Sequence, residues 1–381
     1  MNESRAARHQ RLRRRAQAAG VLSGGALLAV LAFTPAGRAV AAWAESLASP
    51  LPAPIASAAA LTFFVSLLVV AWELAALPAL LLIGQGSPRR QRGHDELISA
   101  RAIAIGAAVA LPVAVLVAAA VQAAAWLAGP WWWLAAAACI AGFLLVVMHA
   151  GPGLLARLSG ARPLTRPALV ERLGALSRQI RVPIQSIDEL PPGATATATA
   201  LVAGGGSARR VFIAAELAQD WSDDEVAFVV AHEFAHHAHH DLWLTLALDT
   251  TVVATGFWVA DRMASGASAS FAPWLPSIGD LAALPFVALT VAAVWVLTAP
   301  ARNAVSRHQE RRADAFALRT TGSADAFRTA LRRLASQHLA EERPSRLTQW
   351  LYHRHPSVAE RLATADAFQG RPRNRSIDPS I

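Results

Sequence analysis

The chain has 381 residues, of which 54% are apolar or aromatic and 16% are charged, a composition that excludes a disordered chain, a coiled coil and an ordinary soluble enzyme. The single cysteine, Cys139, excludes a disulfide framework and any cysteine-based zinc or iron–sulfur site. The net charge of +9 comes from arginines that cluster beside apolar runs, which favours a membrane protein over a nucleic-acid-binding protein.

Six apolar stretches approach or reach the length of about 20 residues that a helix needs to cross a bilayer. They are residues 16–33, 55–83, 102–127, 131–149, 242–260 and 281–299. Arginine-rich and arginine-poor connections alternate along them, which predicts that both termini and the two long polar segments face the cytoplasm. The first stretch follows a basic N-terminus and has a short apolar core, so a cleaved signal peptide is the alternative for it. The residues Trp131 to Trp133 are typical of an interfacial aromatic belt.

These patterns predict six parts. They are a basic N-terminus at 1–15, a four-span region at 16–156, a first polar segment at 157–241, a two-span hairpin at 242–300, a second polar segment at 301–368 and a disordered tail at 369–381.

The first polar segment predicts a small α+β domain. Thr165 and Pro167 open a helix that we expect to end by Pro183, because proline suits a first helical turn and is hostile to a helix interior. The β-prone residues 197–202, the turn at the glycines 204–206 and the returning segment 209–213 then predict a β-hairpin. The expected fold is a mainly α-helical membrane protein with a zincin-like α+β domain that carries this hairpin.

A metal-binding motif follows the hairpin. Ser222 and Glu225 form a capping box that opens a helix. Further along this helix, His232 and His236 lie one turn apart on one face, where both imidazoles can bind one Zn²⁺. Glu233 lies beside that face, where it can take a proton from water bound to the metal.

Zinc needs a third protein ligand, and the candidate is Glu310, just after the last span. A helix there places Glu310 and Asp314 on one face, so that Glu310 can bind the metal while Asp314 orients a ligand imidazole. The alternative is a solvated helix with Glu–Arg pairs. The two histidines favour the ligand interpretation, because the last two spans return the chain to the same side of the membrane.

These residues resemble the integral-membrane zinc metallopeptidases that include HtpX and the CAAX prenyl proteases. The resemblance covers roughly 167–367. Its motifs are residues 199–204, 210–213, 222–225, the His232–His236 motif with His240 and Asp241, residues 310–317, and a late His-Pro … Arg motif at His355, Pro356 and Arg361. Three features depart from the family. Thr199 stands where asparagine is frequent, and His353 competes with His355 for the late-histidine role. The spacer after His236 is also unusually rich in histidine, with His237, His239 and His240.

The resemblance implies a zinc endopeptidase with one zinc per chain, held by His232, His236 and Glu310. Glu233 would then act as general base and pass the proton to the leaving amine. His355 is the candidate donor to the developing oxyanion, and Arg361 the candidate for positioning substrate. The alternatives are a loop histidine before Pro356 and a surface arginine that follows a second capping box.

We expect peptide or protein substrates and a lipid bilayer as partners, with no nucleic acid, in a multi-pass protein of the cell membrane. The substrate backbone would add as a strand beside 199–203. One alternative is a protease-like sensor and signal transducer, although such receptors carry an extracellular domain after the last span. A less favoured one is a zinc transporter, whose ligands lie near mid-membrane. The sequence assigns no role to five ionisable residues: His237, His239, His240, Asp249 and Glu73. It leaves the natural substrate and the oligomeric state open.

Overall fold

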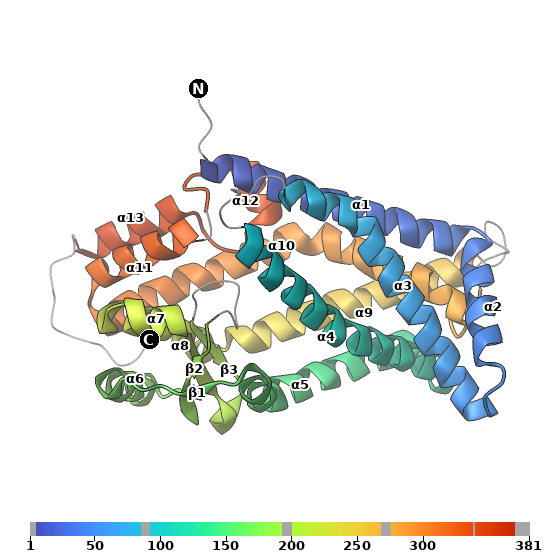
Figure 1. Ribbon diagram of the computed structural model, residues 1–381, viewed down its shortest axis with the longest axis horizontal. Helices are drawn as coiled ribbons and strands as arrows, with labels where there is room; N and C mark the ends of the chain where they lie inside the picture. Colours follow the sequence, from blue (N-terminus) through green and yellow to red (C-terminus); the bar gives the residue numbers. More distant parts are fainter. Residues whose placement is uncertain (1–4, 85–91, 193–199, 268–275, 338–339, 370–381) are drawn as a thin grey trace. The chain divides into compact units, whose positions relative to one another are not determined.

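The structure is a computed structural model that describes residues 5–84, 92–192, 200–267, 276–337 and 340–369 (Figure 1). The chain divides into two compact units. One unit comprises residues 1–7, 145–245 and 300–381, and the other comprises residues 8–144 and 246–299. Both long polar segments fall in the first of these, which we name the polar unit; the second is the apolar unit.

The apolar unit is built from long helices. They are α1 (Arg5–Phe33), α2 (Ala36–Ala48), α3 (Ala53–Gly84), α4 (Arg92–Leu127), and parts of α5 (Trp132–Ser159), α9 (Asp241–Ala267) and α10 (Leu284–Thr321), with short 3₁₀ turns at Gly129–Trp131 and Leu281–Ala283. Within the described ranges, six helices are long and apolar enough to cross a membrane. The prediction of a mainly α-helical protein with about six spans is therefore confirmed.

Helix α2 lies between the first two spans, in a connection where no helix was predicted. Its buried positions, Gly37, Ala41, Ala44 and Ala48, recur every three or four residues and form a face of small side chains. This face packs on α3. Where the chain turns from α1 into α2, the two backbones lie so close that a Cβ at Gly37 would collide with the carbonyl oxygen of Leu31 in α1. Small residues allow such close helix contacts in apolar surroundings.

The tryptophan triplet is only partly a surface feature. Trp131 is 64% exposed, whereas Trp132 is 3% exposed and lies in the core of the apolar unit. The Trp132 indole Nε1 donates a hydrogen bond of 2.8 Å to the buried carboxylate of Asp261. The belt interpretation is wrong for Trp132, because a 3₁₀ turn ends at this point and successive side chains of a helix point in different directions.

The polar unit contains a four-stranded sheet in the order β1-β2-β4-β3. The strands are β1 (Arg162–Pro163), β2 (Ser186–Leu190), β3 (Ala200–Ala203) and β4 (Arg210–Ala214). Strands β3 and β4 pair antiparallel, with Leu201 opposite Phe212, which confirms the predicted hairpin for its described residues. Its predicted start at 197–199, including Thr199, lies outside them. Strand β2 pairs parallel to β4, and β3 forms an edge of the sheet.

The helices of the polar unit between and after the strands are α6 (Pro167–Ile180), α7 (Ala215–Asp220), α8 (Asp223–Ala238), α11 (Ala324–Gln337), α12 (Arg346–Tyr352) and α13 (Val358–Gln369) (Figure 1). Helices α7 and α8 contact the sheet, and α6 and α11 pack on α8. Helix α6 begins at Pro167 and ends before Arg181, which has a left-handed conformation, as the two flanking prolines predict. The capping box at α8 is also confirmed, since the Glu225 N–H donates to Ser222 Oγ and the Ser222 N–H donates to Glu225 Oε2.

Helix α8 is the central element of the polar unit. Val226, Val230 and Phe234 pack into a core formed with α6 and the sheet. On another side, Phe228 and Ala231 pack into a second core formed with α10, α11 and α13. A helix that is apolar nearly all round is stable only when it is buried in this way. The double burial fixes the rotation of α8, and with it the direction of any polar side chain that the helix carries.

Candidate metal centre

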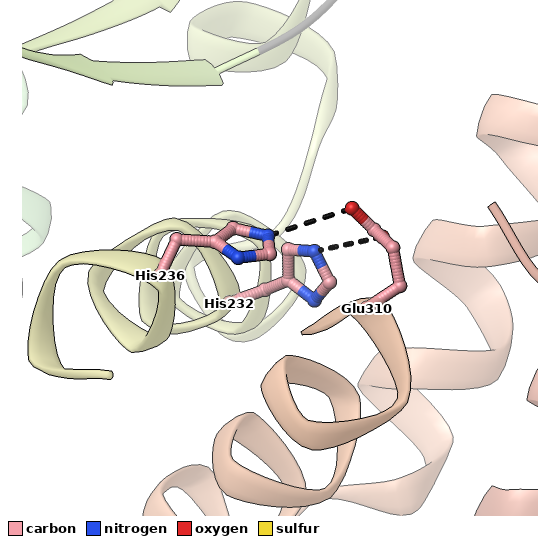
Figure 2. A group of neighbouring side chains, drawn as sticks. All are labelled: His232, His236 and Glu310. Carbon is pink, nitrogen blue, oxygen red and sulfur yellow. Dashed lines mark ion pairs between the residues drawn. The ribbon is translucent and has the colours of Figure 1, made fainter. Parts of the chain in front are cut away.

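Two imidazoles and one carboxylate converge in the polar unit (Figure 2). His232 and His236 come from α8, and their ring centroids lie 5.0 Å apart. Glu310 comes from α10, with Oε2 3.4 Å from His232 Nε2 and Oε1 3.5 Å from His236 Nε2. One ligand atom from each of the three residues lies within 4.8 Å of the other two. The structure thus brings together the three side chains that the sequence suggested as ligands.

The separations fit a divalent metal better than direct hydrogen bonds. Hydrogen bonds between nitrogen and oxygen span about 2.7–3.2 Å, which is shorter than both Glu310 contacts. Bonds of about 2.0–2.1 Å in tetrahedral zinc coordination place neighbouring ligand atoms about 3.3–3.4 Å apart. Both side chains are shielded from solvent, since His232 is 8% exposed and Glu310 is 7% exposed. The donor set and its spacing therefore fit zinc.

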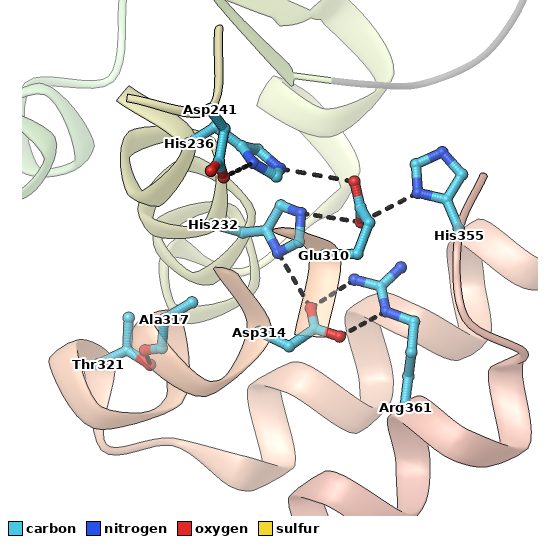
Figure 3. Close-up of polar contacts among 9 residues, drawn as sticks. All are labelled: His232, His236, Asp241, Glu310, Asp314, Ala317, Thr321, His355 and Arg361. Atoms are coloured by element: carbon cyan, nitrogen blue, oxygen red, sulfur yellow. Dashed lines mark hydrogen bonds and ion pairs between the residues drawn. The ribbon is translucent and has the colours of Figure 1, made fainter. Parts of the chain in front are cut away.

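The outer nitrogen of each imidazole meets a second carboxylate (Figure 3). Asp314 Oδ1 lies 3.0 Å from His232 Nδ1, and Asp241 Oδ2 lies 2.9 Å from His236 Nδ1. Contacts of this kind hold the ring in place and keep the proton on Nδ1, which leaves Nε2 for the metal. Both carboxylates are buried, at 1% exposed for Asp314 and 4% for Asp241.

Asp241 was not among the predicted ligands or their supporting residues. Helix α8 ends at Ala238, His240 adopts a left-handed conformation with φ of 60°, and Asp241 begins α9. This break turns the chain back so that the Asp241 carboxylate reaches the imidazole of His236. The sequence does show an aspartate five residues after the second histidine. Its contact with His236 depends on a helix break, which the periodicity of the sequence does not predict.

Arg361 lies behind Asp314. Its Nε and Nη2 donate hydrogen bonds of 2.8 and 2.6 Å to the two carboxylate oxygens of Asp314. Such a two-point contact fixes the plane of the carboxylate as well as its position. The guanidinium also lies 5.9 Å from the ring centroid of Phe327. The structure therefore places Arg361 against Asp314, whose Oδ1 contacts both Arg361 Nη2 and His232 Nδ1 (Figure 3).

Of the two late histidines, His355 is the one that reaches the site. Its Nδ1 lies 3.0 Å from Glu310 Oε2, and its side chain is 67% exposed. It stands in the short loop between α12 and α13, on the solvent side of Glu310 (Figure 3).

The electrostatics of the centre favour a bound cation. Burial alone would lower the pKa of His232, but the carboxylates of Asp314 and Glu310 raise it to about 10. Burial raises the pKa of Glu233 above its usual value, against the opposing effect of the neighbouring imidazoles. A carboxyl group with a raised pKa is suited to accept and return a proton near neutral pH.

The other histidines of α8 have different contacts. His237 Nε2 lies 3.0 Å from the Val202 carbonyl oxygen, and its Nδ1 accepts a hydrogen bond of 3.1 Å from Arg209 Nε. The His239 ring packs edge-on against Phe316, with centroids 5.2 Å apart. His237 therefore ties strand β3 to the helix that carries the metal ligands.

The part of the chain that carries these features is similar to known proteins. Residues 192–369 match the model of Peptidase family M48. A protein named "Uncharacterized metalloprotease YhfN" from Bacillus subtilis is 26% identical over 57% of this chain and 51% of its own length. A "Protease HtpX homolog" from Desulfotalea psychrophila is 29% identical over 42% of this chain and 59% of its own length. The chain thus spans between half and three-fifths of these two relatives.

The fold also matches a solved structure. The crystal structure of S. mikatae Ste24p superposes with a TM-score of 0.64 and 17% sequence identity, covering 86% of this chain and 79% of the other. At this identity the match concerns the fold alone. It extends over both units and therefore includes the apolar helices as well as the domain that carries the candidate ligands.

Proposed function

We propose that the protein is a membrane-embedded zinc endopeptidase that hydrolyses peptide bonds at the cytoplasmic face, as the match of residues 192–369 to the model of Peptidase family M48 suggests. The family implies a metal, and the observation that carries the proposal is the convergence of His232, His236 and Glu310 in one cluster. One zinc per chain would be held by these three side chains. When bound, zinc supplies a Lewis acid and lowers the pKa of coordinated water to about 7.

The residues around the ligands have the chemistry that peptide hydrolysis needs. Glu233 accepts a proton from the attacking water and returns it to the leaving amine, and its raised pKa suits both steps. His355 faces solvent beside Glu310, where its ring can donate to the developing oxyanion. Asp314 and Asp241 hold the two imidazoles in orientation. Arg361 is engaged by Asp314, so we assign it the role of orienting that carboxylate in place of the substrate contact expected from sequence.

The sheet offers a way to bind an extended substrate. Strand β3 is at the sheet edge, and Leu201 on it is 41% exposed. His237 fixes this strand to α8 through the Val202 carbonyl. A peptide that pairs with β3 would therefore run beside the metal centre, as in other proteins that read extended peptides by strand addition. We propose unfolded or membrane proteins as the substrate class, because strand pairing reads backbone rather than one side chain.

Arginine placement supports the orientation. Along the sequence, arginine-rich connections between the apolar stretches alternate with arginine-poor ones, and both long polar segments are arginine-rich. We propose a multi-pass protein of the cell membrane with the catalytic domain in the cytoplasm.

The proposal is tested with purified protein and an unfolded model protein as substrate. We expect cleavage that a chelator abolishes and that zinc restores. The Glu233→Gln variant should keep its zinc and lose activity by about 10²–10⁴-fold, because only the base is removed. Zinc movement across vesicles without peptide cleavage would instead identify a transporter. Full activity in Glu233→Gln would refute the assignment of the base.

A further inference from the structure

One face of helix α10 carries four polar residues that all point at neighbouring elements of the polar unit. Asn303, Arg307, Glu310 and Asp314 are spaced by four, three and four residues, which places them along a single stripe of the helix. Glu310 and Asp314 belong to the metal centre. Arg307 lies about one turn and Asn303 about two turns before Glu310, and the proposed mechanism gives them no part.

Both residues bind the end of helix α12. Arg307 Nη1 donates hydrogen bonds to the carbonyl oxygens of Gln349, at 3.0 Å, and His353, at 2.7 Å. Asn303 Nδ2 donates to the carbonyl oxygen of Leu351 at 2.8 Å and lies 3.4 Å from that of Trp350. The last carbonyls of a helix have no partner within the helix, and a positive charge there is favourable. Asn303 is 8% exposed, so its amide is committed to these contacts.

The loop that follows α12 carries His355. Its other end is fixed at the start of α13, where Ser357 and Glu360 form a capping box. Gln349 Nε2 also donates to Glu360 Oε2 at 2.5 Å, which links the end of α12 to the start of α13. Arg361, in the first turn of α13, is bound by Asp314 of α10. The loop is therefore held to α10 on both sides.

His355 itself has little packing to fix its position. Its side chain is 67% exposed, and the contact with Glu310 is a single approach of 3.0 Å. An exposed side chain on a loop keeps a defined position only when the backbone beneath it is fixed. The hydrogen bonds from Asn303 and Arg307 end two residues before His355, at the carbonyl of His353.

We propose that Asn303 and Arg307 are positioning residues for His355: they fix the end of α12 so that the His355 ring stays beside Glu310 on the substrate side of the metal centre. The proposal rests on the proposed function, because it assigns His355 a part in catalysis. It makes α10 the common support of the third metal ligand, of the carboxylate behind His232 and of the loop histidine.

A double-mutant cycle tests this coupling. A displacement of about 1 Å can lower a rate by about 10²-fold, so we expect Arg307→Ala to lower kcat by about 10- to 100-fold with KM and zinc content little changed. In a chain that already carries His355→Ala, the same Arg307→Ala substitution should have almost no further effect, because the residue acts through His355. Arg307→Lys keeps one charged donor and should retain an intermediate kcat. Arg332→Ala, which removes an exposed arginine of α11, is the matched control.

Two further measurements keep the test decisive. Hydrogen exchange should show faster exchange of the amides at 351–357 in Arg307→Ala and in the milder Asn303→Ser variant, whereas Arg332→Ala leaves it unchanged. The proposal would be overturned if Arg307→Ala lowered kcat by the same factor with His355 present and with His355 replaced by alanine. Unchanged hydrogen exchange of the loop amides in Arg307→Ala would also overturn it. If the wild-type protein showed no metal-dependent cleavage, the proposed function would be refuted instead. The hydrogen-exchange measurement does not depend on that function, so the two failures can be told apart.

Discussion

Replacing Asp314 by asparagine removes one negative charge and leaves the size of the side chain nearly unchanged. Asp314 is 1% exposed and lies between His232 Nδ1, at 3.0 Å, and the two donors of Arg361. The loss of an outer carboxylate typically lowers metal affinity by about 10–100-fold. Breaking a buried ion pair on one side costs about 3 kcal/mol of unfolding free energy, because the Arg361 charge stays buried without a partner. We expect both effects in Asp314→Asn.

The two effects can be separated by a second variant. In Asp314→Leu combined with Arg361→Met, no unpaired charge remains, so most of the lost unfolding free energy should return. The zinc affinity should stay low, because His232 Nδ1 still has no carboxylate. Zinc affinity is measured by competition with a chelator, and stability by thermal unfolding in detergent. Recovery of zinc affinity together with stability, or wild-type affinity in Asp314→Asn, would show that Asp314 does not act through His232.

Three other predictions follow from the contacts. Asp241→Asn should weaken zinc binding by about 10–100-fold while the helices remain folded, as measured by chelator competition and circular dichroism. Zinc affinity should rise with pH, by about tenfold per pH unit near neutrality. The pKa of about 10 keeps His232 protonated in the metal-free protein, so zinc must displace that proton when it binds. A zinc affinity that does not change with pH would contradict this prediction. Trp132→Phe should lower the unfolding free energy by about 1–3 kcal/mol, because Asp261 Oδ1 loses the indole donor while Asp261 Oδ2 keeps the contact with Arg262. Trp131→Phe should change the unfolding free energy little.

Local patterns in the sequence predicted the elements that hold the site. The capping box at Ser222, the proline that opens α6 and the hairpin at Gly204 are each set by a few neighbouring residues, and the structure has all three. The spacing of His232 and His236 likewise fixes their common face once a helix is assumed. The pairing of β2 with β4 was not predicted, because parallel pairing depends on distant segments rather than on a local turn.

The contacts that the sequence did not predict depend on breaks and on long-range packing. Asp241 reaches His236 only because the chain turns at His240, a left-handed position that no glycine marks. The choice between His353 and His355 depends on how α12 is held, and Asn303 and Arg307 hold it from a helix more than forty residues earlier. A sequence pattern describes a single helix face or a single turn, whereas these contacts join elements that are far apart in the sequence.

X-ray absorption at the zinc edge, on protein purified with its bound metal, tests the central claim most directly. Two imidazole nitrogens and a carboxylate oxygen should surround the zinc at about 2.0–2.2 Å, with no sulfur ligand. In Glu310→Gln the carboxylate contribution should disappear or the zinc should be lost. A protein that binds no zinc, a sulfur ligand from Cys139, or a spectrum that Glu310→Gln leaves unchanged would contradict a metal centre made by His232, His236 and Glu310.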